Sequence, residues 1–171
     1  GDNTARASGV IAAAGGGKLL QVVSAVLTST QVISSTSDTD ITNLSVAITP
    51  SSASSKLWVT GMVCSNRWYS TGFIKLQRDI GGAGYADSAF IGDAAGSRKR
   101  CIQFLAIDYG GLTTTFNYLD STNTTSEVTY KAVGWTQSGS YPLYINRTKA
   151  DSDNNSTGRG ASSITVMEIG A

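Results

Sequence analysis

The sequence predicts an all-β fold, an antiparallel β-sandwich of jelly-roll-like type, and three observations indicate this class. Short apolar runs in which alternate residues are polar recur along most of the chain. Polar turn sequences such as TPSSASS, DIGGAG and DSTNTTS separate these runs at roughly the 8–12-residue spacing that is typical of sandwiches. Abundant Gly, Ser and Thr, with no convincing helical stripe of apolar residues, favours strands over helices.

Two parts of the chain differ in composition. Residues 1–17 are rich in small side chains and end in three glycines, which predicts a flexible N-terminal arm that connects or docks. Residues 18–171 carry the alternating pattern and are expected to form one sandwich domain with its own core.

The first half of this domain contains five expected strands. Each is a run of β-branched and other apolar residues bounded by Ser, Thr, Asp or Gly. They cover residues 18–27, 30–34, 43–49, 56–65 and 72–78. Period-two alternation assigns one face of three of them to the core, through Leu44, Val46 and Ile48, through Leu57, Val59 and Val63, and through Ile74 and Leu76.

The second half contains six more expected strands, which cover residues 85–92, 100–109, 114–120, 127–135, 141–147 and 162–169. In the second of these, alternation assigns Ile102, Phe104 and Ala106 to the core face. About ten strands of this kind suggest two antiparallel sheets packed face to face.

The last expected strand raises a question about its partner. Ile164 and Val166 lie on one face, and Met167 and Ile169 on the other. One face fills the core of the monomer, or the strand end packs against identical copies; the two interpretations are compatible. Glu168 shares the face of Ile164 and Val166, which indicates that this face runs out to solvent or into a polar axis near the end.

Charge and residue types exclude several classes of protein. Thirteen Lys+Arg against twelve Asp+Glu give no strong field, so we expect no nucleic-acid partner, and no segment predicts membrane insertion. No histidine is present, which excludes Ser-His and Cys-His catalysis and histidine metal ligands. Cys64 and Cys101 are expected to be reduced core thiols, or else a bridge between adjacent strands.

A glycan-degrading enzyme would need two acids facing each other across a groove. The acidic candidates lie mostly at turns, with no pairing pattern: Asp79, Asp87, Asp93, Asp108, Asp120 and Glu127. We therefore expect no enzyme activity, no catalytic residues and no cofactor.

Two polar motifs have alternative interpretations. Asp151, Asp153 and Asn155 place oxygen ligands at alternating positions, as the first half of a calcium loop does, but a turn stabilised by its own side chains is favoured because the later ligands are missing. Arg98, Lys99 and Arg100 could bind an anionic sugar, a phosphate or an acidic neighbour; a solvated edge or a subunit interface is the favoured interpretation.

Two aromatic segments are the candidate binding site. Aromatic rings stack on sugar faces while nearby amides and guanidinium groups bind hydroxyls, and the same composition suits a protein interface. The alternative is that the tryptophans cap the core. The candidate binding residues are Arg67, Trp68, Tyr69, Trp135, Gln137, Tyr141 and Tyr144.

Five separated blocks carry a resemblance to a known module: GKLLQVVSAVLTSTQV, LSVAITPSSASSKLWV, IGDAAGSRKR, FNYLDSTNTTSEVTYKA and YINRTKADSDNNSTGRGASSITVMEIGA. Over about residues 17–171 the chain resembles a module of tailed-bacteriophage virion proteins, met as a small virion protein and as the C-terminal head of fibre proteins. The resemblance implies a homotrimeric jelly roll and supplies no catalytic residues.

The expected function is therefore structural. The chain is expected to be a trimeric tail-fibre or receptor-binding head domain on the virion exterior, assembled in the bacterial cytoplasm and attached to other virion proteins through residues 1–17. It would bind a host-surface glycan or protein. The alternative is a capsid decoration protein anchored by the same arm.

Overall fold

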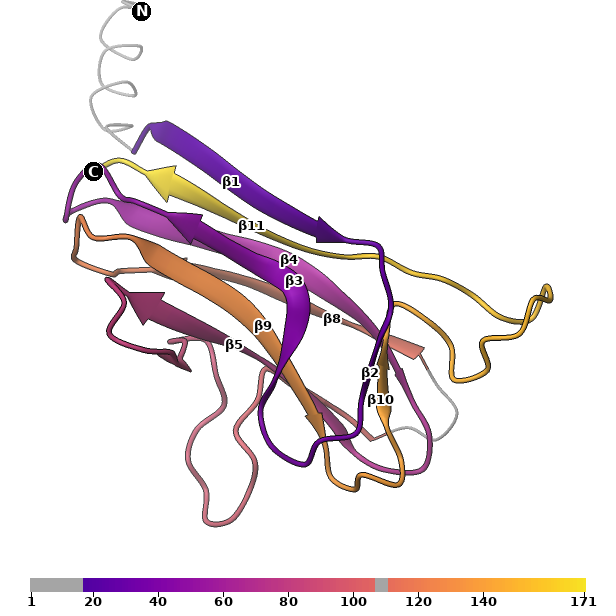
Figure 1. Cartoon of the computed structure of the whole chain (residues 1–171). Coiled ribbons are helices and arrows are strands. Elements are labelled where there is room, and N and C mark those ends of the chain that lie inside the picture. Colours follow the sequence, from indigo (N-terminus) through magenta and orange to yellow (C-terminus); the bar gives the residue numbers. More distant parts are fainter. Residues whose placement is uncertain (1–16, 107–110) are drawn as a thin grey trace, which may run out of the picture.

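Two antiparallel sheets form a sandwich in the computed structural model, which describes residues 17–106 and 111–171 (Figure 1). The described strands are β1 (Leu19–Leu27), β2 (Gln31–Ile33), β3 (Thr39–Ile48), β4 (Lys56–Arg67), β5 (Gly72–Ile80), β6 (Ala86–Asp87), β7 (Gln103–Leu105), β8 (Gly111–Asp120), β9 (Val128–Thr136), β10 (Leu143–Ile145) and β11 (Ser162–Ile169). Within these residues, no helix is long and apolar enough to cross a membrane. The expected all-β sandwich is confirmed.

The first sheet is organised around β4. One side of β4 pairs with β11 and, further along, with β10, while the other side pairs with β8. Strands β1 and β2 add to β11 and β10. The second sheet has the order β3-β9-β5, and the short strands β6 and β7 pair with β5.

Most expected strands are present, and three are much shorter than expected. The strand expected at 85–92 is only Ala86–Asp87, the one expected at 100–109 is Gln103–Leu105, and the one expected at 141–147 is Leu143–Ile145. Part of the second range, and nearly all of the arm expected at 1–17, lie outside the described residues.

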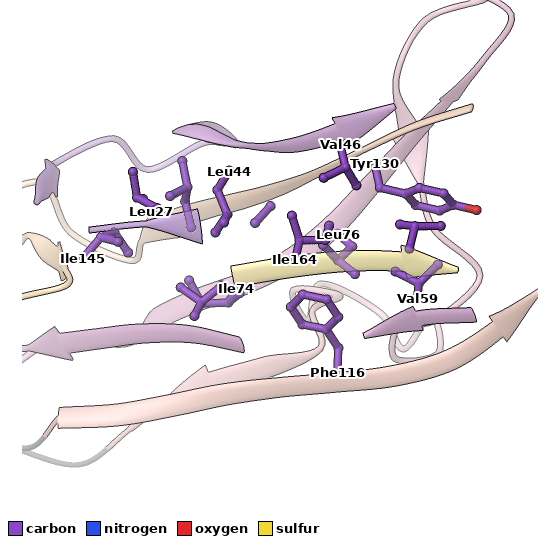
Figure 2. Close-up of a cluster of buried hydrophobic side chains, with 14 of the residues drawn as sticks. Leu27, Leu44, Val46, Val59, Ile74, Leu76, Phe116, Tyr130, Ile145 and Ile164 are labelled. Carbon is purple, nitrogen blue, oxygen red and sulfur yellow. The ribbon is translucent and has the colours of Figure 1, made fainter. Parts of the chain in front are cut away.

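The core lies between the sheets and follows the predicted alternation (Figure 2). The three faces predicted in the first half of the domain are buried. Gly61 of β4 also faces inward, and a Cβ atom there would lie 2.6 Å from the Phe116 ring and 2.3 Å from the Ser163 carbonyl oxygen. Glycine at this position therefore makes room for the Phe116 ring.

The core face predicted for residues 100–109 is wrong. Phe104 is 62% exposed, whereas Leu105 is buried. The cause is the register with β5: Phe104 pairs with Phe73 on the outer face, and Leu105 pairs with Gly72. A three-residue strand takes its orientation from its neighbour, because its own alternation is too short to decide it.

The expectation for Glu168 is also wrong, because its face does not run out to solvent. Glu168 has no accessible surface, and it accepts hydrogen bonds from the Ser51 N–H (2.8 Å), the Ser51 hydroxyl (2.7 Å) and the Gln21 side chain (2.6 Å). Burial acts to raise the pKa of Glu168, but these donors outweigh it and lower the pKa to about 2. The loop after β3 thus covers the Glu168 carboxylate, and the hydrogen bonds from Ser51 and Gln21 satisfy its oxygen atoms.

A second buried polar group fixes the opposite end of β11. Asn146, with a φ of 57°, donates hydrogen bonds to the carbonyl oxygens of Leu27 (2.8 Å) and Ser29 (3.0 Å). Its own side-chain oxygen accepts a 2.6 Å hydrogen bond from Ser162. Asn146 therefore joins the end of β1 to the start of β11.

The two ends of the sandwich differ in what they carry. Leu19 pairs with Ile169, and the Gly170 N–H donates to the Lys18 carbonyl oxygen, so both termini of the described domain lie beside the start of β4 (Figure 1). The loops after β4 and β9 lie at the other end. Because β4 has twelve residues, roughly 40 Å of strand separates the two ends.

Candidate functional site

Three of the seven candidate binding residues form an exposed cluster at the end of the sandwich distant from the termini. Tyr69, with a φ of 61°, lies 5.5 Å from Trp68 and 5.9 Å from Tyr141, measured between ring centroids. Both tyrosines are exposed. The Lys149 ammonium lies 3.1 Å from the centre of the Trp68 ring. We call Trp68, Tyr69 and Tyr141 the aromatic cluster. It places aromatic rings and the Lys149 ammonium at the end of the sandwich distant from the termini.

The other four candidates do not join this exposed cluster. Arg67 and Tyr144 are buried, and Trp135 is only 3% exposed and stacks on Phe73 with ring centroids 5.0 Å apart. Gln137 follows β9, and its N–H donates to the Thr71 carbonyl oxygen. Sequence reasoning therefore identified one exposed cluster and grouped it with three buried residues, Arg67, Trp135 and Tyr144, and with Gln137, which lies at the same end of the sandwich.

The burial of Trp135 differs from the expected core cap. Its β9 neighbours Ala132 and Gly134 face the core, so alternation places Trp135 on the outer face of the second sheet. Residues 34–38 and 88–102 cover this face, with the Thr136 N–H bonded to Ser35 and the Ile102 N–H bonded to Ile74. These loops explain why an outward-facing tryptophan is buried.

Lys75 lies beside Trp135 under the same loops. The Lys75 ammonium is 2.6 Å from Asp38 and 2.7 Å from Asp87, and it lies 5.4 Å from the Trp135 ring centre. Only 7% of Lys75 is exposed. Burial acts to lower the pKa of Lys75, but hydrogen bonds and attraction from the two carboxylates outweigh it, so the pKa is raised. The ammonium therefore stays charged under the loops.

A hollow of about 530 Å³ opens over this ion triad, and a second hollow of about 490 Å³ adjoins it beside Trp135. They share Thr36, Ser97, Lys99 and Trp135, so we treat them as one groove, the Lys75 groove. The first hollow is further lined by Ser37, Asp38, Lys75, Asp87, Gly96, Arg98 and Arg100, and the second by Thr71, Phe73, Thr136 and Gln137. The basic segment 98–100 noted in the sequence thus borders a polar groove.

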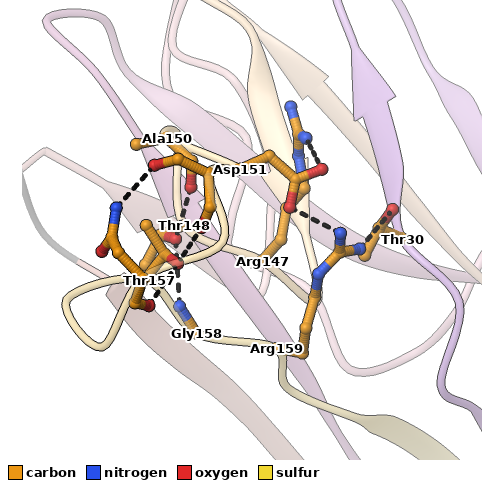
Figure 3. A network of polar contacts seen from close by, with 10 residues as sticks. Thr30, Arg147, Thr148, Ala150, Asp151, Thr157, Gly158 and Arg159 are labelled. Carbon is orange, nitrogen blue, oxygen red and sulfur yellow. Dashed lines mark hydrogen bonds and ion pairs between the residues drawn. The ribbon is translucent and has the colours of Figure 1, made fainter.

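The Asp151 loop is held together by its own side chains (Figure 3). Asp151 forms ion pairs with Arg147 and with Arg159, and the Arg159 guanidinium lies 2.6 Å from it. Thr148 bonds the Ala150 carbonyl oxygen at 2.7 Å. Asp153 and Asn155 are exposed. The carboxylate of Asp151 is therefore neutralised by two arginines, as in the favoured interpretation of a self-stabilised loop.

The two thiols and two of the candidate acids have ordinary structural surroundings. Cys64 and Cys101 are free, half-buried thiols whose pKa is raised by burial. Asp120 accepts hydrogen bonds from Arg78 and from the Tyr130 hydroxyl, which ties β8 to the opposite sheet. Asp79 accepts a hydrogen bond from the Gly84 N–H in a turn.

A row of exposed apolar side chains crosses the outer face of the first sheet. The strand registers place Val22 of β1, Met167 of β11, Trp58 of β4 and Leu119 of β8 side by side. Val22 is 51% exposed, Trp58 42% and Leu119 53%. We call these four residues the apolar row.

Around the apolar row, this face lacks the charges of a solvated sheet. On β1, β11, β4 and β8 its other outward residues are Leu20, Ser24 and Val26 of β1, Ser163, Thr165 and Ile169 of β11, Lys56, Thr60, Met62, Cys64 and Asn66 of β4, and Gly111, Thr113, Thr115 and Asn117 of β8. On β10 and β2 they are Tyr144 and Val32, and there the Arg147 guanidinium lies 5.1 Å from the centre of the Tyr144 ring. Lys56, at the end near the termini, is the one charged residue among these described outward positions. A partner that packs on such a face buries almost no charged group, so association carries little cost for removing water from ions.

Comparison with known proteins finds similarity among solved structures. No family model and no curated protein matches the chain. Among similar solved structures is one titled "Structure of infectious bursal disease virus Gx strain", with 11% sequence identity and a TM-score of 0.37. The match covers 89% of this chain and 42% of that chain, so this chain spans less than half the length of that protein. The surfaces described above are therefore interpreted from their own geometry.

Proposed function

We propose that the chain is a non-enzymatic virion structural protein that works as a trimeric tail-fibre or receptor-binding head. Its copies associate through the outer face of the first sheet, and its distal loops contact the host surface. The proposal rests on the resemblance of residues 17–171 to phage virion modules and on two features of the fold.

The observation that carries the proposal is the separation of the two ends. The termini lie together beside the start of β4, and the aromatic cluster lies at the other end of the same strand (Figure 1). A domain attached through its terminal end thus presents Tyr69 and Tyr141 outward. Exposed tyrosines provide large contact area at low cost in conformational entropy.

The apolar row supports association of identical copies. Large exposed apolar residues that form a continuous row on a sheet face are typical of interaction surfaces. A second copy of the chain is the occupant that matches this face best, because a nearly uncharged face meets its own equivalent without like-charge repulsion. The three copies of one trimer would each contact the host surface weakly. Once one copy is bound, the other two are held near the surface at high effective concentration, so the trimer binds more tightly than a single copy.

The described carboxylates support a non-enzymatic role. Asp87 is paired with Lys75, Asp120 with Arg78, and Asp79 with a turn N–H. Each therefore has a structural partner, and Asp38, the acid that lines the Lys75 groove together with Asp87, contacts the same Lys75 ammonium. Asp108 lies outside the described residues.

The test is to locate the chain on the virion and to block attachment with purified protein. Cryo-electron microscopy of particles decorated with a specific Fab should show it at fibre tips, and added protein should reduce phage adsorption. Location on the capsid shell without an effect on adsorption would overturn the proposal in favour of a capsid decoration protein anchored by residues 1–17.

A further inference from the structure

We infer that the Lys75 groove binds a saccharide that carries an anionic group. The inference rests on the proposed adhesive function for its biological meaning, but it concerns a site distinct from the aromatic cluster. The groove lies on the outer face of the second sheet and shares no lining residue with the aromatic cluster, although Thr71 and Gln137, from the loops after β4 and β9 that also form the cluster, line one part of it.

The lining has the donors and acceptors that a polyol requires. Thr36, Ser37 and Ser97 supply hydroxyls, and the partly exposed carboxylates of Asp38 and Asp87 accept hydrogen bonds. Sugar hydroxyls both donate and accept, so a mixed polar lining satisfies them without leaving buried partners unpaired. The volume of the first hollow falls within the roughly 300–1,000 Å³ of known small-molecule sites.

The charge of the lining selects for an acidic ligand. Lys75, Arg98, Lys99 and Arg100 bring four positive charges, against two negative charges from the aspartates. The two aspartates are in contact with Lys75, and the remaining cations lie on the loop segment 98–100. Arg100 is oriented by its Nε hydrogen bond to the Gly92 carbonyl oxygen, 2.8 Å long. A carboxylate or phosphate on the sugar would meet these cations.

The buried Lys75 triad is the second reason to assign a site here. Burying a lysine between two carboxylates is seldom the most stable way to fill space, since apolar residues of equal volume often do as well or better. Here two ion pairs hold the Lys75 ammonium in place, so that the triad forms a polar floor of the groove beside Trp135. A polar floor that is oriented before the ligand binds is the arrangement that a sugar-binding groove needs.

The experiment titrates the purified protein with three probes by calorimetry at low salt: maltotriose, trigalacturonic acid and a phosphorylated maltotriose. We expect an acidic probe to bind at least fivefold more tightly than maltotriose, and the two acidic probes distinguish a carboxylate from a phosphate ligand. Binding should weaken as salt is raised. No binding of either acidic probe, or equal binding of the neutral one, would overturn the inference.

Lys99→Gln tests the site itself, because Lys99 is exposed and lines both hollows. It should weaken acidic-probe binding at least fivefold without changing the melting temperature. Lys18→Gln, an equal charge change at the terminal end, should leave binding unchanged; equal weakening by both variants would show non-specific attraction and overturn the inference. If the purified protein binds neither acidic probe but still blocks phage adsorption, the groove assignment is overturned and the proposed adhesive function stands. If the protein binds the acidic probes but is monomeric, only the proposed trimer is overturned.

Discussion

The Glu168 carboxylate accepts hydrogen bonds from both the backbone N–H and the hydroxyl of Ser51, at 2.8 and 2.7 Å. This contact joins the last strand of the first sheet to the loop that leaves β3 in the second sheet. The residues are 117 positions apart in the sequence, so the C-terminal strand is anchored across the sandwich.

This contact predicts a loss of stability at acid pH. The pKa of Glu168 is about 2 in the folded protein and 4.5 ordinarily, so the unfolded chain binds the proton more readily between these values. The stabilisation is complete above about pH 4.5 and is lost as the pH falls towards 2. Glu168→Gln should lower the free energy of unfolding by about 1–3 kcal/mol at neutral pH.

Urea unfolding at fixed protein concentration, repeated from pH 7 to pH 2.5, measures this effect. The difference between the wild-type protein and Glu168→Gln should shrink as the pH falls. Glu127→Gln, at an exposed position, serves as the control. A difference that stays constant over the whole range would contradict the assigned hydrogen bonds.

Gly61→Ala should destabilise the sandwich through overpacking. The new methyl group would lie 2.3 Å from the Ser163 carbonyl oxygen, and a backbone atom paired in the sheet cannot move aside freely. We expect a loss of about 1–3 kcal/mol in the free energy of unfolding. Gly158→Ala, where nothing lies within 4 Å of the added atom, should change stability by much less in the same urea titration.

The two parts of the predicted aromatic site should respond differently to alanine. Trp135→Ala removes a buried ring stacked on Phe73 and should cost about 3–5 kcal/mol of stability. Tyr69→Ala combined with Tyr141→Ala removes exposed rings, so it should reduce the blocking of phage adsorption while the melting temperature changes little. A large loss of melting temperature in the tyrosine variant would show that the cluster is structural.

Lys75→Met should also destabilise the protein, although the new side chain has a similar size. It leaves Asp38 and Asp87 without the ammonium that neutralises both. Because the two aspartates are partly exposed, we expect about 1–3 kcal/mol, less than for a fully buried pair. Adding Asp87→Asn to Lys75→Met should recover part of the loss, as measured by urea unfolding; no recovery would contradict the ion triad.

The alternation of polar and apolar residues predicted the fold well because the long strands have one solvent-exposed face and one buried face. Leu57, Val59 and Val63 in β4, and Ile164 and Val166 in β11, are buried as expected. Phe104 was misassigned because its strand has three residues and follows the register of β5. Alternation of polar and apolar residues decides which face of a strand is buried only where the strand is long enough for the pattern to repeat several times.

The candidate site was only partly predictable, because its geometry depends on contacts between distant segments. The sequence drew attention to Tyr69 and Tyr141, which do meet, but also to Trp135, which the segment 88–102 covers. The Lys75 groove had one sequence signal, the basic segment 98–100. Nothing local indicates that this segment faces Asp38, which lies about sixty residues earlier in the chain.

Association through the apolar row is the central claim of this account, and the mass of the protein in solution tests it most directly. Sedimentation equilibrium should give three protomers of 17.8 kDa each for the wild type and for Phe104→Lys, a change on the other sheet. Trp58→Lys should give a single folded protomer, because it places a charge in the middle of the row. A wild-type protein that sediments as one protomer at all concentrations would contradict the account.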